Sequence, residues 1–414
     1  MSRILLLLAT HTYRAEDFLA AARQLGVEVI VASNSRQALE ELVPDATLEV
    51  DFADIEVGTR AIVQLAERHP LDAIVAAEDD GVLLAAAASK SLSLAHNSPE
   101  SAAAARYKHL MRAALAEARV PSPAHRLFSV EDDPAAAAAQ VDFPCVLKPV
   151  FLSASRGVIR ANGRLDFIDA FQRIARILEA PDVRDHHDPA ADLVLVEDFV
   201  PGAEVALEGV LSEGNLKVLA MFEKPDPLEG PFFEETLYIT PSERPADQQA
   251  EIAERVAAAA SALGLWHGPV HAELRINADG IYVIEIAPRS IGGLCSRTLR
   301  FGAGISLEEL ILRHATGRSI DDLSRESRAA GVLMIPIPRA GLLNEVRGVA
   351  EAEIVEGIRG LKISIPIGQE VVPLPEGHQY LGFIFASGDT TAEVEAALRK
   401  AHRKLDFAIE PTDG

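Results

Sequence analysis

Residues 271–286 read HAELRINADGIYVIEI, in which two alternating apolar runs are separated by an Asp-Gly dipeptide. An Asp-Gly pair between such runs is a strong signal for a β-hairpin. If residues 278–280 form the loop, Glu273 lies directly opposite Glu285 in the next strand. The pattern therefore predicts two carboxylates side by side on one face of the hairpin.

The hairpin is followed by APRSIGG at residues 287–293, which contains an arginine and a Gly-Gly pair. Two carboxylates on a rigid sheet, with a guanidinium and a glycine loop beyond them, suit a Mg²⁺ ion that holds a triphosphate. Mg²⁺ prefers oxygen ligands and takes them from one or two carboxylates, from phosphates and from water. The alternative is a pair of solvated glutamates on an exposed sheet face, since exposed glutamate is common.

The composition limits the class of protein. The chain has 414 residues, too many for a single core, so we expect about two to four packed units. Its net charge of −23 argues against nucleic acid and against an anionic membrane surface as partners. Because the chain has only two cysteines, we expect no disulfide framework and a cytoplasmic location. We find no membrane-spanning segment, and the short apolar run at residues 4–9 fits a buried first strand better than a signal peptide.

The first 97 residues alternate between strand and helix patterns, which predicts a parallel sheet with crossover helices. Strands are expected at 3–9, 27–32, 72–77 and 92–95, and helices at 15–25, 35–42, 56–68 and 80–89. No G-x-G-x-x-G follows the first strand, so a dinucleotide site there lacks its fingerprint.

The rest of the chain predicts mixed α/β structure. A helix over 101–120 is expected after a Ser98 cap with Pro99 in its first turn. Further strands are expected at 143–150, 193–197, 203–211, 216–222, 332–338, 361–367 and 380–386, with helices at 165–178 and 245–263. A last helix begins near Thr390, where T-T-A-E has capping-box spacing.

Chemical features occur in a fixed order along this pattern. Lys108, near a helix start, precedes Lys148, which lies inside an apolar strand, and the small-residue loop 153–157 follows. Glu197 and Glu204 come next, and the paired-glutamate hairpin is last. In this ordered set the chain resembles the ATP-grasp superfamily of carboxylate–amine ligases, and within it the L-amino acid ligase (dipeptide synthetase) branch, over nearly its whole length.

The resemblance implies an α/β and α+β protein with the ATP-grasp fold. It would have an N-terminal Rossmann-like parallel-sheet domain and a nucleotide clamped between two α+β subdomains. The implied parts are an N-terminal α/β domain (1–97), a connecting helix (98–124), a small ATP-binding lid (125–202), a central catalytic subdomain (203–330) and a C-terminal strand-rich subdomain packed on the catalytic core (331–414).

The resemblance also assigns roles to matching positions. ATP would be bound by Lys108, Lys148, Ser153, Ser155, Gly157, Glu197, Phe199, Val200 and Glu204. Ammonium groups suit phosphate oxygens, and small residues let backbone N–H groups approach them. Mg²⁺ would be bound by Glu273 and Glu285. Arg289 would grip the reacting phosphoryl and carboxylate groups, because a guanidinium binds such groups bidentately. Glu235 and His271 are alternative proton acceptors, and the substrate pocket would be formed by Ser290, Gly292 and Gly293.

The implied activity is an ATP- and Mg²⁺-dependent ligase that activates a small-molecule carboxylate as an acyl phosphate and couples it to an amine, with amino acids expected on both sides. A homodimer through the N-terminal domain is also implied. Ala287 stands where many members carry Asn as a further metal ligand, so the number of metal ions stays open. Two alternatives are a ligase with a thiol or bicarbonate-type substrate and a nucleotide-binding regulator without turnover.

Overall fold

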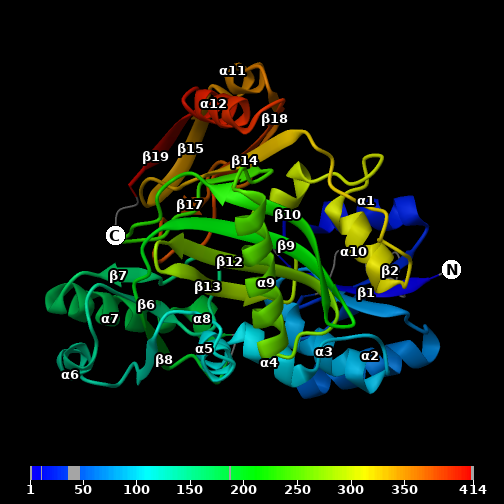
Figure 1. Ribbon diagram of the computed structural model, residues 1–414, viewed down its shortest axis with the longest axis horizontal. Helices are drawn as coiled ribbons and strands as arrows, with labels where there is room; N and C mark the ends of the chain where they lie inside the picture. Colours follow the sequence, from blue (N-terminus) through cyan, green and yellow to red (C-terminus); the bar gives the residue numbers. More distant parts are fainter. Residues whose placement is uncertain (1, 11, 36–46, 186–187, 412–414) are drawn as a thin grey trace.

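A computed structural model describes residues 2–10, 12–35, 47–185 and 188–411, in which helices and strands mix as expected. In the view of Figure 1 a central sheet lies between the N-terminal sheet, a smaller sheet formed by residues 125–198, and the C-terminal helices. Within the described ranges, no helix is long and apolar enough to cross a lipid bilayer.

The N-terminal sheet is parallel, as predicted, with the strand order β3-β2-β1-β4. Its elements are β1 (Arg3–Leu7), α1 (Ala15–Leu25), β2 (Glu28–Ser33), β3 (Thr47–Glu49), α2 (Ile55–Arg68), β4 (Ala73–Ala76), the 3₁₀ turn η2 (Asp79–Gly81) and α3 (Val82–Ser91). Residues of β1 pack into a different apolar cluster on each face of the sheet, which explains the continuous apolar run at 4–8.

The helix expected at 35–42 falls almost wholly on residues outside the described ranges. The strand expected at 92–95 is wrong, because the chain adds a last turn to α3 instead of extending. Leu92 N–H donates to the Ala88 carbonyl at 3.0 Å, which continues the bonding pattern of α3, and Ser93 has a positive φ of 55°.

The expected helix after Ser98 is divided in two. Ser98 caps it and Pro99 occupies its first turn, as predicted, but Tyr107 is extended (φ −99°, ψ 111°). The two helices are α4 (Pro99–Arg106) and α5 (Lys108–Glu117). The break makes Lys108 the first residue of α5, and its N–H donates to the Val150 carbonyl at 2.9 Å. This bond ties the start of α5 to the neighbouring sheet.

The next part of the chain, which we call the lid, is an antiparallel sheet with the order β5-β8-β6-β7. Its elements are β5 (His125–Ser129), α6 (Pro134–Ala137), η3 (Ala138–Gln140), β6 (Cys145–Pro149), β7 (Ile159–Ala161), α7 (Arg164–Leu178), α8 (Pro181–Arg184) and β8 (Leu193–Asp198). The apolar face of α7, with Phe167 and Phe171 buried, packs on this sheet.

The central sheet has eight antiparallel strands in the order β13-β12-β9-β10-β11-β14-β18-β16. Its strands are β9 (Ala203–Ser212), β10 (Asn215–Lys224), β11 (Leu237–Thr240), β12 (Gly268–Asn277), β13 (Gly280–Ala287), β14 (Ala329–Ile335), β16 (Ile358–Ile363) and β18 (Gly382–Gly388). Helix α9 (Ala246–Ala262) covers one face of β9, β10, β12 and β13 through a shared apolar cluster.

Strands from the C-terminal part of the chain thus extend the central sheet. The remaining elements are η4 (Cys295–Thr298), α10 (Leu307–Ala315), α11 (Val349–Glu353), α12 (Thr391–His402) and a small sheet of β15 (Gly341–Arg347), β17 (Glu370–Val371) and β19 (Asp406–Glu410). The capping box predicted at the start of α12 is confirmed, with Thr390 and Glu393 bonding each other's backbone N–H groups.

The hairpin of β12 and β13 pairs Glu273 with Glu285, as predicted, but by a different route. Asn277 pairs with Gly280, so the loop has two residues and not three. A β-bulge next to Glu273 then adds one residue to β13, and the two differences cancel. The bulge also makes Ile284 and Glu285 both face away from the core under α9, so both line a cleft on the other side of the sheet.

Candidate active site

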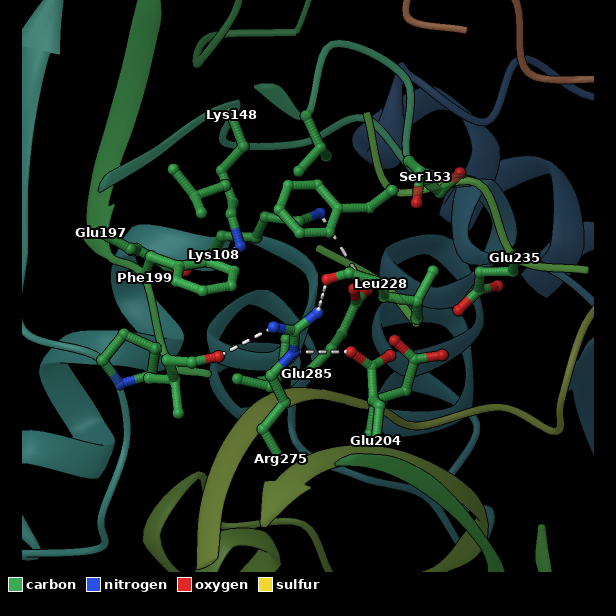
Figure 2. Close-up of a pocket in the computed structure, with 18 of the residues that line it drawn as sticks. Lys108, Lys148, Ser153, Glu197, Phe199, Glu204, Leu228, Glu235, Arg275 and Glu285 are labelled. Atoms are coloured by element: carbon green, nitrogen blue, oxygen red, sulfur yellow. Dashed lines mark hydrogen bonds and ion pairs between the residues drawn. The ribbon is translucent and has the colours of Figure 1, made fainter. Parts of the chain in front are cut away.

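A cleft with about 700 Å³ of open space lies between the lid and the central sheet. Figure 2 shows side chains from both units converging on it. Of the residues predicted to bind ATP or Mg²⁺ or to take part in catalysis, the structure places around this cleft Lys108, Lys148, Ser153, Ser155, Glu197, Phe199, Val200, Glu204, Glu235, Glu273 and Glu285.

Lys148 is held in the cleft by a buried ion pair. Its ammonium lies 2.7 Å from Glu197 Oε2, while the other oxygen of Glu197 accepts from Arg112 Nε at 2.7 Å. Burial raises the pKa of Glu197, but Arg112 and Lys148 lower it by a larger amount, so that the resulting pKa is about 2. Both oxygens of Glu197 are therefore occupied, and this carboxylate orients Lys148.

Lys108 and the loop after Lys148 form the next part of the cleft wall. Lys108 Nζ donates to the Leu152 carbonyl at 2.7 Å and lies 4.0 Å from Glu285 Oε1. Burial lowers the pKa of Lys108. Gly157 belongs to the predicted phosphate loop but is not among the cleft-lining residues, and its N–H donates to the Pro375 carbonyl at 2.9 Å. This hydrogen bond ties the loop to the C-terminal part of the chain.

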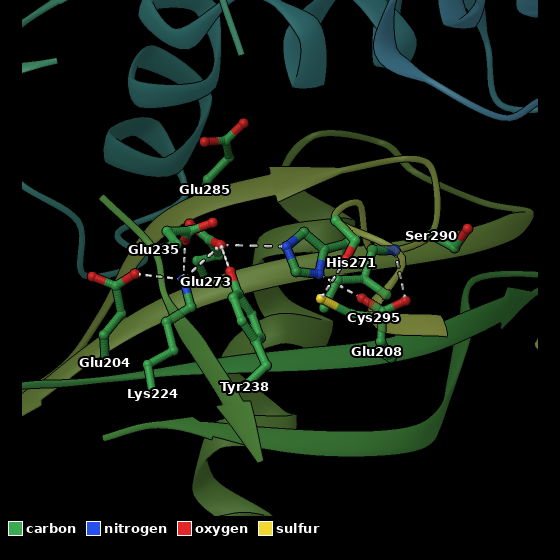
Figure 3. Close-up of polar contacts among 12 residues, drawn as sticks. Glu204, Glu208, Lys224, Glu235, Tyr238, His271, Glu273, Glu285, Ser290 and Cys295 are labelled. Atoms are coloured by element: carbon green, nitrogen blue, oxygen red, sulfur yellow. Dashed lines mark hydrogen bonds and ion pairs between the residues drawn. The ribbon is translucent and has the colours of Figure 1, made fainter. Parts of the chain in front are cut away.

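An acidic cluster forms the floor of the cleft (Figure 3). Lys224, at the end of β10, bonds Glu204 and Glu273 at 2.7 Å each and also bonds Glu235. Arg275 Nε donates to the second oxygen of Glu204 at 2.9 Å. Neither Lys224 nor Arg275 is among the site residues predicted from the sequence, although strand alternation places Arg275 on the same face as Glu273, which lies two residues earlier in β12.

Glu235 is the titratable group of this cluster with a pKa near neutrality. Burial and the Glu273 carboxylate raise its pKa, Lys224 lowers it, and the balance is about 7. A carboxylate with such a pKa can take up or hold a proton at physiological pH. Glu235 therefore remains a candidate proton acceptor.

His271 lies behind the cluster and does not line the cleft. Its Nδ1 is 2.5 Å from Glu208 Oε1 and its Nε2 is 3.4 Å from Glu273 Oε1. Burial lowers the pKa of His271, but the Glu208 and Glu273 carboxylates raise it by a larger amount, so that the resulting pKa is about 9. A protonated ring with both nitrogens engaged is a poor proton acceptor, so the geometry argues against the predicted catalytic role of His271.

Arg289 does not line the cleft in this structure. Its Nε and Nη2 each donate to a carboxylate oxygen of Asp79, in the turn η2, at 2.9 Å. Burial raises the pKa of Asp79, but Arg289 lowers it to about 2. Arg289 is thus paired with the N-terminal domain through a salt bridge. In this arrangement its guanidinium bonds Asp79 and is not placed to grip a substrate in the cleft.

The predicted substrate residues Ser290, Gly292 and Gly293 also face the N-terminal domain. Arg14 donates to Ser290 Oγ at 2.6 Å, and the Gly293 N–H donates to the Tyr13 hydroxyl at 2.8 Å. The same hydroxyl lies 3.7 Å from where a Cβ on Gly292 would sit. The loop is not part of the cleft lining, and sequence reasoning could not find partners about 280 residues away.

Comparison with known proteins identifies this architecture. The family model of the ATP-grasp N-terminal domain matches residues 19–96, and that of the ATP-grasp domain matches residues 141–298. The chain belongs to the ATP-grasp superfamily. Residues 333–410 match the model of the L-amino acid ligase C-terminal domain 2, so within the superfamily the chain is similar to the L-amino acid ligases.

Individual relatives agree with this assignment. The crystal structure of an L-amino acid ligase from Bacillus licheniformis matches with a TM-score of 0.82 and 24% identity over 99% of both chains, which shows the shared fold. The uncharacterised protein y4rH of Sinorhizobium fredii is 23% identical over 99% of this chain and 84% of its own length. The alanine–anticapsin ligase of Bacillus amyloliquefaciens is 28% identical over 61% of this chain, a match that spans only about half (55%) of that ligase. Other curated relatives are D-alanine–D-alanine ligases, for example that of Methylibium petroleiphilum, which is 32% identical over 43% of this chain and 54% of its own length.

Proposed function

We propose that this protein is an ATP- and Mg²⁺-dependent ligase. It activates the carboxylate of an amino acid as an acyl phosphate and couples it to the amine of a second amino acid, giving a dipeptide or related amide with ADP and phosphate. The observation that carries the proposal is the cleft, in which two buried lysines from the lid side face the acidic pair of the central hairpin. The family of the chain supports the choice of nucleotide and reaction.

The residues of the hairpin suit Mg²⁺. Glu273 and Glu285 stand opposite each other and both line the cleft, which gives the one or two carboxylates that Mg²⁺ usually takes beside phosphates and water. Glu273 Oε1 is engaged by protein donors, whereas among the described residues no donor contacts its Oε2. When bound, Mg²⁺ would neutralise charge on the phosphates during transfer.

The protein's own groups then supply position and charge. Lys148, fixed by Glu197, and Lys108, fixed by the Leu152 carbonyl, would each meet phosphate oxygens of ATP. The loop 153–157 would cover the phosphates and keep water from the acyl phosphate. Glu235, with its pKa of about 7, would accept the proton that the attacking amine releases.

ADP release with twenty amino acids, offered singly and in pairs, tests this proposal. We expect ADP only when a suitable pair and Mg²⁺ are present, and a product whose mass equals the two amino acids less water. Glu285→Gln should abolish most of this activity, while Glu356→Gln, which alters an exposed carboxylate in the C-terminal part, should not. A folded protein that releases no ADP with any pair or other carboxylate would refute the ligase assignment.

The quaternary structure and location are part of the proposal. The family resemblance supports a homodimer through the N-terminal domain, and analytical ultracentrifugation of the full chain tests it. A cytoplasmic location rests on the low cysteine count.

A further inference from the structure

Lys224 occupies an unusual position in the acidic cluster. Its side chain is 2% exposed and comes from the last residue of β10. Its ammonium contacts one oxygen on each of three carboxylates, those of Glu204 on β9, Glu273 on β12 and Glu235 in the segment before β11. An ammonium has three N–H donors, so each carboxylate receives one and none is left over.

The three carboxylates form a donor set of the kind that holds a cation. One oxygen from each lies within 4.8 Å of the others, a spacing compatible with a metal ion between them. Divalent ions such as Mg²⁺ and Mn²⁺ prefer oxygen ligands of this type. In this protein the Lys224 ammonium lies at that point of convergence.

Lys224 is one of three groups that fix which oxygen of Glu273 is available to a ligand. Glu273 Oε1 is contacted by Lys224 Nζ at 2.7 Å, by the Tyr238 hydroxyl at 3.2 Å and by His271 Nε2 at 3.4 Å. In the part of the chain that the structure describes, no donor contacts Oε2. A carboxylate with one oxygen fixed by protein donors presents the other in a defined direction, as second partners of metal ligands commonly ensure.

We propose that Lys224 is a positioning residue that takes the place of a metal ion among Glu204, Glu235 and Glu273, and so reserves the second oxygen of Glu273 for the metal of the nucleotide. This inference rests on the proposed function for the identity of the ligand. It adds that the acids of the cleft have separate tasks. Glu204 and Glu235 are tied to an internal cation, while Glu273 serves both that cation and, with Glu285, the nucleotide's metal.

Titration with MnCl₂ alone tests the first part of the proposal. Calorimetry on the metal-free full chain should show no site tighter than about 1 mM in the wild type or in Lys90→Met, which alters an exposed lysine. Lys224→Met frees the three carboxylates and should bind Mn²⁺ at least about tenfold more tightly. Removing one of the three in Lys224→Met/Glu235→Gln should abolish that gain. A folded Lys224→Met protein with wild-type Mn²⁺ affinity would overturn the proposal.

Nucleotide binding tests the second part, with variants that do not depend on Lys224→Met folding. Lys224→Met/Glu235→Gln removes one positive and one negative charge, so it keeps the charge balance of the cluster. Compared with the wild type, whose cluster carries the same net charge, it should bind MgADP about tenfold more weakly, because a charged hydrogen bond that orients Glu273 is lost. Metal-free ADP should bind the two proteins equally. Equal MgADP affinities would show that Lys224 only balances charge, and would refute its positioning role.

These readouts are separable from the ligase assignment. Neither titration requires amino acids or turnover, so the expected pattern can appear in a protein that forms no peptide. Conversely, the wild-type protein could be an active ligase while the variants bind Mn²⁺ and MgADP as the wild type does. That result would support the proposed function and refute the positioning role of Lys224.

Discussion

Arg112 and Lys148 offer a matched test of how the cleft is built. Both contact Glu197 at 2.7 Å, and their side chains are 1% and 8% exposed. Only Lys148 is among the cleft-lining residues, whereas Arg112 Nη2 donates to the Ile284 carbonyl. Substituting either by methionine should therefore destabilise the protein similarly, whereas only Lys148→Met should weaken nucleotide binding strongly.

The magnitude follows from the pKa of Glu197. A pKa of about 2 in place of 4.5 corresponds to roughly 3 kcal/mol in favour of the ionised carboxylate, and the two cations supply this after offsetting its burial. Breaking a buried pair by removing one partner costs about 3–5 kcal/mol, so we expect about 3 kcal/mol for each variant. The lost phosphate contact of Lys148 adds about 1.5–3 kcal/mol to binding, or about a tenfold to hundredfold weaker affinity for ADP.

Urea denaturation gives the free energy of unfolding of each variant, and calorimetry gives the dissociation constant for MgADP. Lys90→Met, at an exposed ion pair, serves as the control and should change neither quantity measurably. Equal losses of ADP affinity in Arg112→Met and Lys148→Met would refute the idea that Arg112 only supports Glu197 while Lys148 binds the nucleotide. Unchanged stability in both would refute the energetic role of the pair.

Three further predictions concern groups around the cleft. Burial lowers the pKa of His271 but its carboxylate neighbours raise it to about 9, so this ring stabilises the fold fully below pH 6.5 and loses that stabilisation as the pH rises through 9. Urea denaturation should show a fall of up to about 3 kcal/mol over this range that His271→Gln lacks, and parallel pH curves would contradict it. Arg173, on the lid, donates from Nε and Nη2 to the Glu376 carboxylate at 2.5 and 2.8 Å. Because this pair is half-exposed, its loss in Arg173→Met should speed ADP release by only up to about fivefold, as measured by stopped flow. Unchanged release would show that this contact does not hold the lid. Arg289→Met leaves the mostly buried Asp79 carboxylate unpaired, so it should lower the free energy of unfolding in urea by about 3–5 kcal/mol. ADP affinity should stay constant, because Arg289 lies outside the cleft lining. A parallel loss of ADP affinity would count against that placement.

The hairpin illustrates what could be predicted from the sequence. Alternating apolar residues and an Asp-Gly turn were sufficient to place Glu273 opposite Glu285. The loop length was wrong by one residue, and a β-bulge that no local pattern signals restored the pairing. Local periodicity thus placed the two glutamates on one face, whereas the bulge, which also turns Ile284 toward the cleft, leaves no mark in the alternation.

Long-range partners could not be predicted in the same way. Arg289 bonds Asp79, 210 residues earlier in the chain, and a guanidinium looks the same in sequence whether it binds a protein carboxylate or a substrate. Lys224 was missed for a related reason. Its three carboxylate partners come from separate segments, and only the order of strands β10, β9 and β12 in the sheet brings two of them beside it.

The most direct test of the account is a crystal structure of the full chain with MgADP. The account predicts the diphosphate beside Lys108 and Lys148, and the metal about 2.1 Å from carboxylate oxygens of Glu273 and Glu285, with the Lys224 ammonium still in place among its three acids. A nucleotide bound elsewhere, or a metal that contacts neither member of the hairpin pair, would contradict it.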